Sequence, residues 1–288
     1  MHNIKDIKSN LEVFVKSISK RNYKIDEKLL LSLDKKNRDL IQKKEKLEQE
    51  KKIISKGGDK SLFEKSKKLS NEIDQISSEQ LKVKSELDNF LSNIPNLPLD
   101  DVPEGQDESH NSEVEKKGNI PEFKFKPKSH SELGDHLKMI DFDLASKTSG
   151  SRFVFLKSNL ALLERALSNF MVDKHTSENG YTEVSPPLIA SESTMFGTGQ
   201  LPKFIDDQFE LKLDEKTEKK FLIPTAEVIL TNIVRDKILN INELPLRFVA
   251  STPCFRKEAG SYGKDTKGMI RQHCLLYTSP SPRDRSLS

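Results

Sequence analysis

Residues 252–273, TPCFRKEAGSYGKDTKGMIRQH, decide how the rest of this 288-residue chain is interpreted. They place Arg256 and Arg271 on either side of a loop that contains three glycines. Because glycine permits positive φ and a close approach of the backbone, such a loop can press against a ligand. Arginine binds phosphate through two parallel charge-assisted hydrogen bonds. The stretch therefore predicts a strand, a long phosphate-binding loop and a second strand.

The residues just after the first arginine suit contacts to a nucleotide. Glu258 lies two residues after Arg256, so in a strand both side chains would point to the same face. A carboxylate there can accept a hydrogen bond from an amino group. The loop is not a Walker loop, because Gly263-Lys264 is followed by Asp265 where that loop needs serine or threonine. The residues alone leave open a basic hairpin of a nucleic-acid binder.

A second candidate stretch, FLIPTAEVILTNIVRD at residues 221–236, predicts a strand followed by a helix from about Ala226. Pro224 and Glu227 are typical of the first turn of a helix. The ordinary interpretation of Thr225 and Glu227 is therefore N-capping, and from these residues alone a substrate site is the alternative.

Two heptad runs in the N-terminal part predict an antiparallel helical hairpin. They flank Gly57-Gly58, and the apolar seam is narrow, so the hairpin should project into solvent. This part carries more basic than acidic residues, which favours a polyanion such as RNA over a spacer or an oligomerising coiled coil only slightly. The heptad positions are Leu33, Leu40, Leu47 and Ile54, then Leu62, Leu69, Ile76, Val83 and Phe90.

A proline-containing acidic stretch ends the hairpin and predicts a domain boundary. Pro95, Pro98 and Pro103 cannot continue a helix. We expect an N-terminal domain at 1–100, a linker at 101–119 and a second domain from residue 120.

The second domain should combine helices with a sheet. Residues 151–155 predict a strand. Residues 157–178 predict a helix packed on the sheet through Leu160, Leu163, Leu167 and Met171, which recur at helical spacing. Residues 195–200 predict a loop.

Composition excludes several classes of protein. The chain is 34% hydrophobic and 32% charged, and it has no run of 18 apolar residues, so no membrane span is expected. Its N-terminus lacks the apolar core of a signal peptide, so secretion is not expected. Two cysteines form no disulfide framework and fit a reducing cytoplasm. No zinc-type spacing of Cys and His occurs, so no metal-ligating residues are predicted.

The string FRKEAGSYGKDTKGMIRQH closely resembles motif 2 of class II aminoacyl-tRNA synthetases, in the form found in bacterial-type seryl-tRNA synthetases. The similarity extends over nearly the whole chain up to His273. It includes MFGTGQLPKF at 195–204 and the helix, strand and proline of residues 157–187, which resemble motif 1. The resemblance implies an α+β fold, with an antiparallel coiled-coil hairpin followed by a class II antiparallel β-sheet domain flanked by helices.

The resemblance also implies an activity and its partners. These are an ATP-dependent ligase that activates L-serine as seryl-adenylate and transfers it to the 3′ end of tRNA(Ser), with Mg²⁺ beside the ATP. The coiled-coil arm would bind tRNA(Ser), and residues 157–187 would form a homodimer. The implied location is the cytoplasm.

Site residues follow from the resemblance position by position. Arg256 and Arg271 would be catalytic. The serine-binding residues would be Thr225, Ala226 and Glu227. The ATP-binding residues would be Arg256, Lys257, Glu258 and Arg271.

After His273 the sequence departs from the family pattern. Residues 274–288 are rich in Ser, Pro and Arg and lack a strand pattern. The acidic residue expected near Ser279 and the arginine motif called motif 3 are absent. We therefore interpret 120–273 as an incomplete catalytic domain and 274–288 as a non-native tail, and we do not expect this truncated chain to be a competent enzyme. The alternative is a non-catalytic, synthetase-like RNA-binding protein that uses the coiled-coil arm.

Overall fold

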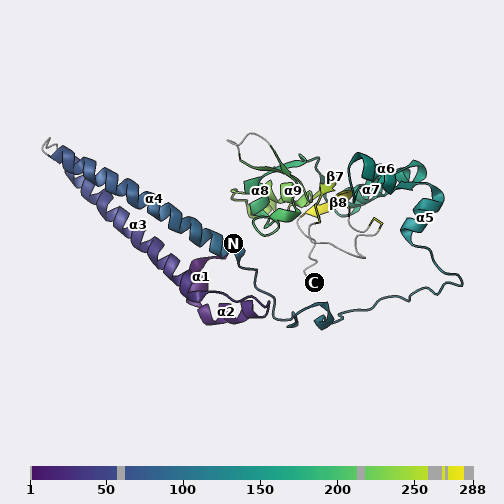
Figure 1. Cartoon of the computed structure of the whole chain (residues 1–288), viewed down its shortest axis with the longest axis horizontal. Coiled ribbons are helices and arrows are strands. Elements are labelled where there is room, and N and C mark those ends of the chain that lie inside the picture. Colours follow the sequence, from purple (N-terminus) through teal and green to yellow (C-terminus); the bar gives the residue numbers. More distant parts are fainter. Residues whose placement is uncertain (1, 57–61, 213–217, 259–267, 270–271, 282–288) are drawn as a thin grey trace. The chain divides into compact units, whose positions relative to one another are not determined.

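The computed structural model describes residues 2–56, 62–212, 218–258, 268–269 and 272–281 (Figure 1). The chain divides into two compact units, residues 1–119 and 120–288, which are described separately.

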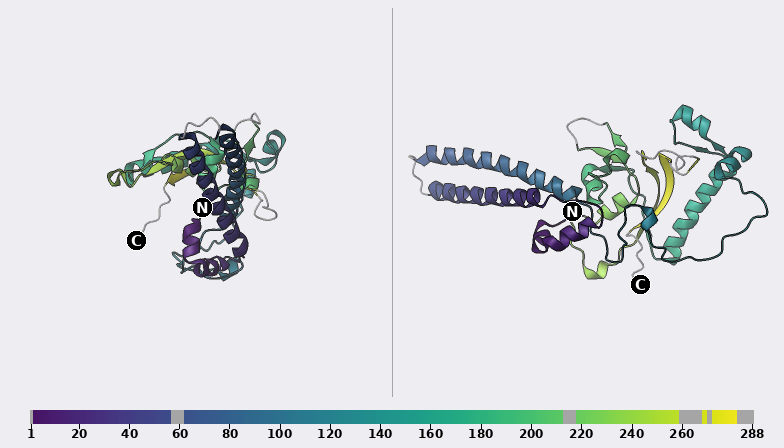
Figure 2. Two further views of the ribbon diagram at one scale, coloured as in Figure 1. Left: turned by 90° about the vertical axis from the view of Figure 1, so that its left-hand side faces the viewer. Right: turned by 60° about the horizontal axis from the view of Figure 1, so that its bottom comes forward.

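The first unit is a helical arm with a small helical base. Figures 1 and 2 show its two long helices running side by side. The Gly57-Gly58 turn between them lies outside the described residues. The helices are α1 (Ile4–Ser9), α2 (Leu11–Ser19), α3 (Glu27–Lys56), α4 (Phe63–Asn93) and the 3-10 helix η2 (Glu108–His110).

The heptad seam forms the contact between α3 and α4, which confirms the predicted hairpin. Leu40, Ile76 and Val83 are buried together, with Leu33 and Leu47 packed against them. A second cluster fills the base where α1 and α2 meet the hairpin. It contains Ile7, Phe14, Ile18, Ile25, Leu30, Leu87, Leu91 and Ile94.

An ion-pair network connects this base to the arm. Asp34 on α3 is 5% exposed. Its carboxylate accepts from Lys8 Nζ at 2.8 Å and from Arg38 Nε at 3.1 Å. Because a buried carboxylate needs compensating partners, these contacts fix α1 against α3.

The second unit is built from short strands and helices. Its helices are α5 (His130–Leu137), α6 (Phe142–Thr148), α7 (Ser158–Glu178), α8 (Glu192–Gly197), η3 (Ile205–Asp207), α9 (Glu227–Asn232) and η4 (Ile241–Glu243). Its strands are β1 (Ile140–Asp141), β2 (Phe155–Leu156), β3 (Thr182–Glu183), β4 (Ile189–Ser191), β5 (Glu210–Leu211), β6 (Lys220–Leu222), β7 (Phe248–Phe255) and β8 (Cys274–Ser281). Within the described residues they pair in the orders β1-β2, β3-β7-β8 and β4-β6-β5.

Strand β7 is the centre of the sheet that carries the site. It pairs antiparallel with β8 from Phe255↔Cys274 to Phe248↔Ser281. On its other edge it pairs in parallel with β3, through Thr182↔Phe248. Helix α7 packs against β7 and β8 on one face (Figure 2). On the other face, Ala250 is buried with Ala226 and Leu230 of the α9 region.

Strand β8 corrects the prediction that residues 274–288 lack a strand. Residues 274–281 pair with the whole length of β7, because the edge of β7 offers main-chain hydrogen-bonding groups that need partners. Pro280 has no N–H to donate, but β8 lies at the edge of the described sheet, where proline is tolerated.

Two further boundaries differ from the prediction. The strand expected at 151–155 contains only Phe155 of those residues, because Arg152 has φ +65, which is left-handed backbone. Residues 195–197 are helical rather than loop, since Ser191 caps α8 by accepting from the Thr194 N–H.

The predicted orientation of α7 is also wrong. Leu163 and Leu167 are each 50% exposed and Met171 is 41% exposed, so the periodic apolar face points away from the sheet. The sheet side of α7 includes buried Ser168, whose hydroxyl is hydrogen bonded to that of Ser251 on β7. Periodicity located an apolar face but not its partner.

Candidate functional site

The two candidate stretches meet at the end of β7. The Phe255 N–H donates to the Ile223 carbonyl at 2.9 Å. One residue further on, Arg256 Nε donates to the Pro224 carbonyl at 3.1 Å. The exposed guanidinium of Arg256 is thereby oriented beside the segment that continues into Thr225. The structure thus brings together residues that the sequence analysis placed in one site.

The triplet 225–227 opens helix α9. Thr225 is 8% exposed, and its Oγ1 accepts from the Glu227 N–H at 3.3 Å, although the N-cap position of α9 is held by Ala226 and not by Thr225. The Ala226 side chain is fully buried against Leu230 and Ala250, so any ligand contact it makes must use its backbone. Glu227 begins the helix and is half-buried.

Both ends of the loop that follows β7 are held by backbone hydrogen bonds. Arg256 N–H donates to the His273 carbonyl at 2.9 Å, and His273 Nδ1 donates to the Arg256 carbonyl at 2.9 Å. Lys257 N–H donates to the Asp207 carbonyl at 2.9 Å. The Lys257 ammonium lies 5.9 Å from the ring centroid of Phe209, a cation–π distance.

Glu258 is not on a strand, which corrects the prediction that it shares a strand face with Arg256. Strand β7 ends at Phe255, and Glu258 has φ +50. Left-handed backbone at a residue other than glycine turns the chain, so alternation of side chains does not apply there. Glu258 is half-buried.

Arg152 is a site residue that the sequence analysis missed. Its Nη1 donates to the carbonyls of Lys257 at 3.3 Å and of Glu258 at 2.6 Å. The contact spans more than a hundred residues of sequence, and no spacing or charge pattern connects the two segments. Only a three-dimensional arrangement could have revealed it.

Arg271 lies outside the described residues, so its catalytic and ATP-binding roles remain predictions. Its neighbour Gln272 is 3% exposed, and Gln272 Nε2 donates to the Gly268 carbonyl at 2.6 Å. The Met269 N–H donates to Nε2 of His130. These contacts place the C-terminal end of the loop against the rest of the unit.

The cysteines of the site are not activated. Burial raises the pKa of the Cys254 thiol, and burial is also the main cause of the raised pKa of the Cys274 thiol. Since the thiolate is the reactive form, neither side chain is a nucleophile near neutral pH.

The described residues offer no metal site of their own. Nowhere in that part of the chain do three or more His, Cys, Asp or Glu side chains gather in a way that could hold a metal ion. Likewise, no described helix is long and apolar enough to cross a membrane.

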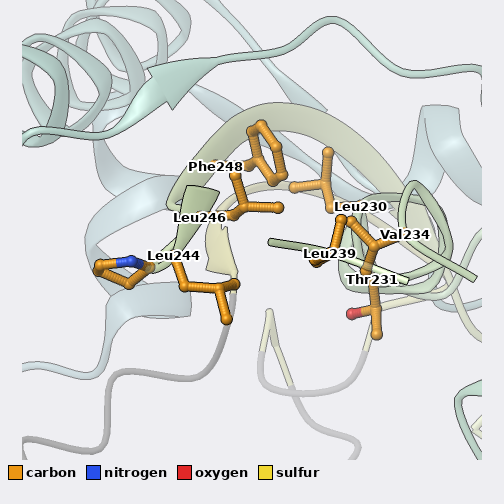
Figure 3. Close-up of a pocket in the computed structure, with 8 residues that line it drawn as sticks. Leu230, Thr231, Val234, Leu239, Leu244, Leu246 and Phe248 are labelled. Carbon is orange, nitrogen blue, oxygen red and sulfur yellow. The ribbon is translucent and has the colours of Figure 1, made fainter. Parts of the chain in front are cut away.

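An apolar pocket of about 380 Å³ lies at the opposite end of β7 (Figure 3). At roughly 3.3 Å per residue, the eight residues of β7 separate the pocket from Arg256 by about 25 Å. Its wall offers almost no polar groups to serine or phosphate, so it is not the substrate site. The lining residues are Leu230, Thr231, Val234, Leu239, Leu244, Pro245, Leu246 and Phe248.

Comparison with protein families agrees with this arrangement. Residues 208–276, which contain α9, β7 and Arg256, match the tRNA synthetase class II core domain (G, H, P, S and T). The sheet and its loop are therefore part of a class II aminoacyl-tRNA synthetase core. Residues 1–98 match the Seryl-tRNA synthetase N-terminal domain.

Individual relatives narrow the class. A serine–tRNA ligase of Pelagibacter ubique is 66% identical over 273 residues, covering 95% of this chain and 65% of the relative. That of Azorhizobium caulinodans is 46% identical, covering 95% and 67%. The seryl-tRNA synthetase of Pyrococcus horikoshii, solved in complex with ATP, has TM-score 0.80 and 30% identity, covering 96% and 68%. The chain belongs to the seryl-tRNA synthetase family.

These matches confirm the predicted α+β fold of a helical arm followed by part of a class II sheet domain. The chain spans about two thirds of the length of the curated relatives it matches.

Proposed function

We propose that this chain belongs to a serine–tRNA ligase, which forms seryl-adenylate from L-serine and ATP and transfers the seryl group to tRNA(Ser). The observation that carries the proposal is the hydrogen bond from Arg256 Nε to the Pro224 carbonyl. This contact supports the proposal, because the Arg256 guanidinium lies beside the segment that continues into the triplet 225–227, and a nucleotide and an amino acid could meet there.

The activation step needs no protein nucleophile. The serine carboxylate attacks the α-phosphate of ATP, and pyrophosphate leaves. The protein must align these groups and stabilise the charge that moves between them. The raised pKa of Cys254 fits this chemistry, because a reactive thiol would add nothing to it.

Each residue then has a distinct role. Arg256 holds the α-phosphate through its planar guanidinium. Glu258 accepts from the adenine amino group, and Lys257 adds positive charge near the nucleotide. The Thr225 and Glu227 side chains bind serine, with the Glu227 carboxylate toward its ammonium group. Arg271 assists at the phosphates. Mg²⁺ would accompany ATP and neutralise its phosphate charge.

The arm is proposed to bind tRNA(Ser). Its long helices present lysines to solvent along their whole length, which suits contacts to phosphate and sugar that read shape rather than sequence. Such binding should weaken as salt concentration rises. The exposed lysines include Lys43, Lys46, Lys52, Lys67, Lys68, Lys82 and Lys84.

Helix α7 is proposed to form a homodimer interface within the 157–187 region. Its outward face carries large apolar side chains that are 41% to 61% exposed, more than isolated surface residues would explain. These are Leu162, Leu163, Leu167, Phe170 and Met171. Leu167→Glu should convert dimer to monomer in light scattering, whereas Leu81→Glu, on exposed arm surface, should not.

A cytoplasmic location is proposed because aminoacylation serves protein synthesis there. The two cysteines are free, as in a reducing compartment.

The test is serine-dependent pyrophosphate exchange. It is run on the purified chain and on a chimera, called the continued protein below, in which residues 1–273 are followed by the C-terminal third of the Pelagibacter ubique relative. Arg256→Ala removes the proposed charge contact to the α-phosphate and should lower the kcat of the continued protein roughly 10²-fold, because the contact acts mainly in the transition state. Arg256→Lys should restore only part of the rate. Glu258→Gln should mainly raise the KM for ATP.

Melting curves of the same variants separate chemistry from folding. If Arg256→Ala melts well below the parent yet keeps its kcat per folded molecule, Arg256 is structural and the assignment is wrong. If the continued protein shows no serine-dependent exchange, the proposed activity is wrong.

A further inference from the structure

A single residue outside the recognised motifs contacts both ends of the loop that follows β7. The Arg152 guanidinium donates to the carbonyls of Lys257 and Glu258 at the N-terminal end of the loop. The Arg152 carbonyl accepts from the His273 N–H at 2.8 Å, at the C-terminal end. Arg152 therefore connects the two places where the loop leaves and rejoins the sheet.

The backbone at this contact has an unusual conformation on both sides. Arg152 has φ +65 and Glu258 has φ +50. Residues other than glycine rarely adopt left-handed backbone, and where they do, the surrounding contacts must hold them there. The 2.6 Å hydrogen bond from Arg152 Nη1 to the Glu258 carbonyl is such a contact.

The residue next to Arg152 supports the same region. The ring centroid of Phe153 lies 5.2 Å from that of His273, and the ring centroid of Phe209 lies 5.7 Å from it. With its ring held, His273 Nδ1 can donate to the Arg256 carbonyl. The segment 152–153 thus contacts the backbone of Lys257 and Glu258 directly and that of Arg256 through His273.

We propose that Arg152 is a positioning residue for nucleotide binding. It fixes the backbone of residues 256–258, and through that backbone the directions of the Arg256 and Glu258 side chains. The proposal rests on the proposed function for its consequence, but not for the contact itself. Both hydrogen bonds come from one nitrogen, Nη1, whose N–H groups are fixed in the guanidinium plane, whereas the rotatable ammonium of lysine does not hold that geometry.

Amide hydrogen exchange in the chain as it stands tests the contact. The Arg256 and Lys257 amides are both hydrogen bonded and should exchange slowly. Removing a charged donor from this network should speed their exchange about 10-fold or more in Arg152→Ala. Arg152→Lys should give an intermediate rate. The matched control is Arg247→Ala, which removes an exposed arginine whose backbone carbonyl accepts from the Thr182 N–H.

Nucleotide binding tests the consequence. In pyrophosphate exchange with the continued protein, Arg152→Ala should raise the KM for ATP about 10-fold, since misdirected side chains bind ATP less well. Its kcat should fall less than that of Arg256→Ala. The KM for serine should stay near the parent value, a separation that a general loss of folding would not give.

The outcomes are distinguishable. If Arg256→Ala impairs pyrophosphate exchange and Arg152→Ala does not, the positioning role is wrong while the proposed function stands. If neither variant matters for activity but Arg152→Ala still releases the two amides, the proposed function fails and the contact stands as structural only, which also overturns the positioning role. If Arg152→Ala and Arg152→Lys speed amide hydrogen exchange evenly through the whole sheet unit and lower its Tm, Arg152 stabilises the unit as a whole and the proposal is wrong.

Discussion

The arm and the sheet unit are held together by different kinds of contact. In the arm, side chains that recur every seven residues pack α3 against α4, and Leu40, Ile76 and Val83 are typical. In the sheet unit most strands have two or three residues, and contacts such as Arg152 to Glu258 join segments far apart in sequence. The arm is thus specified by a short sequence repeat, whereas the site depends on backbone contacts that no repeat records.

Removing the arm should have the largest effect, because it should affect tRNA charging and leave amino-acid activation in place. Deletion of residues 27–92 from the continued protein should abolish charging of tRNA(Ser) while serine-dependent pyrophosphate exchange is retained. The reason is that α3 and α4 lie in the first compact unit, whereas the Arg256 region lies in the second. Charging and exchange are measured on the same preparation. Equal loss of both activities would show that the units do not work separately.

A core substitution in the sheet unit should have the second-largest effect. Phe221 is fully buried with Ile223 and Val228, so Phe221→Ala should cost about 3–5 kcal/mol of the free energy of unfolding of this unit. The arm should keep its helical signal, followed by circular dichroism at 222 nm. Phe63→Ala is the control, because Phe63 is 72% exposed on α4. Simultaneous melting of both units would contradict their independence.

How far the sequence predicts each region follows from the same difference. The hairpin was predicted because a seven-residue repeat is itself local information. The helix predicted at 157–178 is observed as Ser158–Glu178. The orientation of that helix was wrong, because a periodic face says which residues lie together and not what covers them.

The candidate site was predictable only in part. The sequence located Arg256 and Thr225, and the structure brought their segments together. Strand β8 was missed because its pairing uses main-chain groups, which the type of side chain does not report. Arg152 was missed because its partners are two carbonyl oxygens, which leave no trace in residue type.

A conservative change in the arm seam should have a smaller effect. Ile76→Val removes one buried methyl group between α3 and α4, and should cost about 1 kcal/mol of arm stability. Ile53→Val, at a 73% exposed position on α3, is the matched control. Thermal melting of the isolated arm measures the difference. A cost equal to that of the control would mean that the seam is not packed as described.

The smallest expected effect is a pH dependence of the arm. A hydrogen bond and the charge of Lys36 hold the pKa of Glu79 below its ordinary value of 4.5. A carboxylate with a lowered folded-state pKa stabilises the fold above its ordinary pKa, and this stability is lost as pH falls through the lowered value. The Tm of the arm should therefore fall slightly more between pH 5.5 and pH 3.5 in the parent than in Glu79→Gln. A larger drop in the variant would contradict the pairing.

The parallel pairing of β3 with β7 has a consequence for synthesis on the ribosome. The residues of the arm and its base cluster all lie within the first 94 residues, so the arm can form before the sheet unit has been made. Strand β3 must wait for Phe248 before it finds its partner. Until Cys274 and the following residues emerge, the other edge of β7 presents unpaired main-chain groups to solvent. A nascent chain paused between Phe255 and Cys274 would therefore have a folded arm and, in its second unit, an unpaired strand edge that is prone to aggregation. Chaperones shield surfaces of this kind.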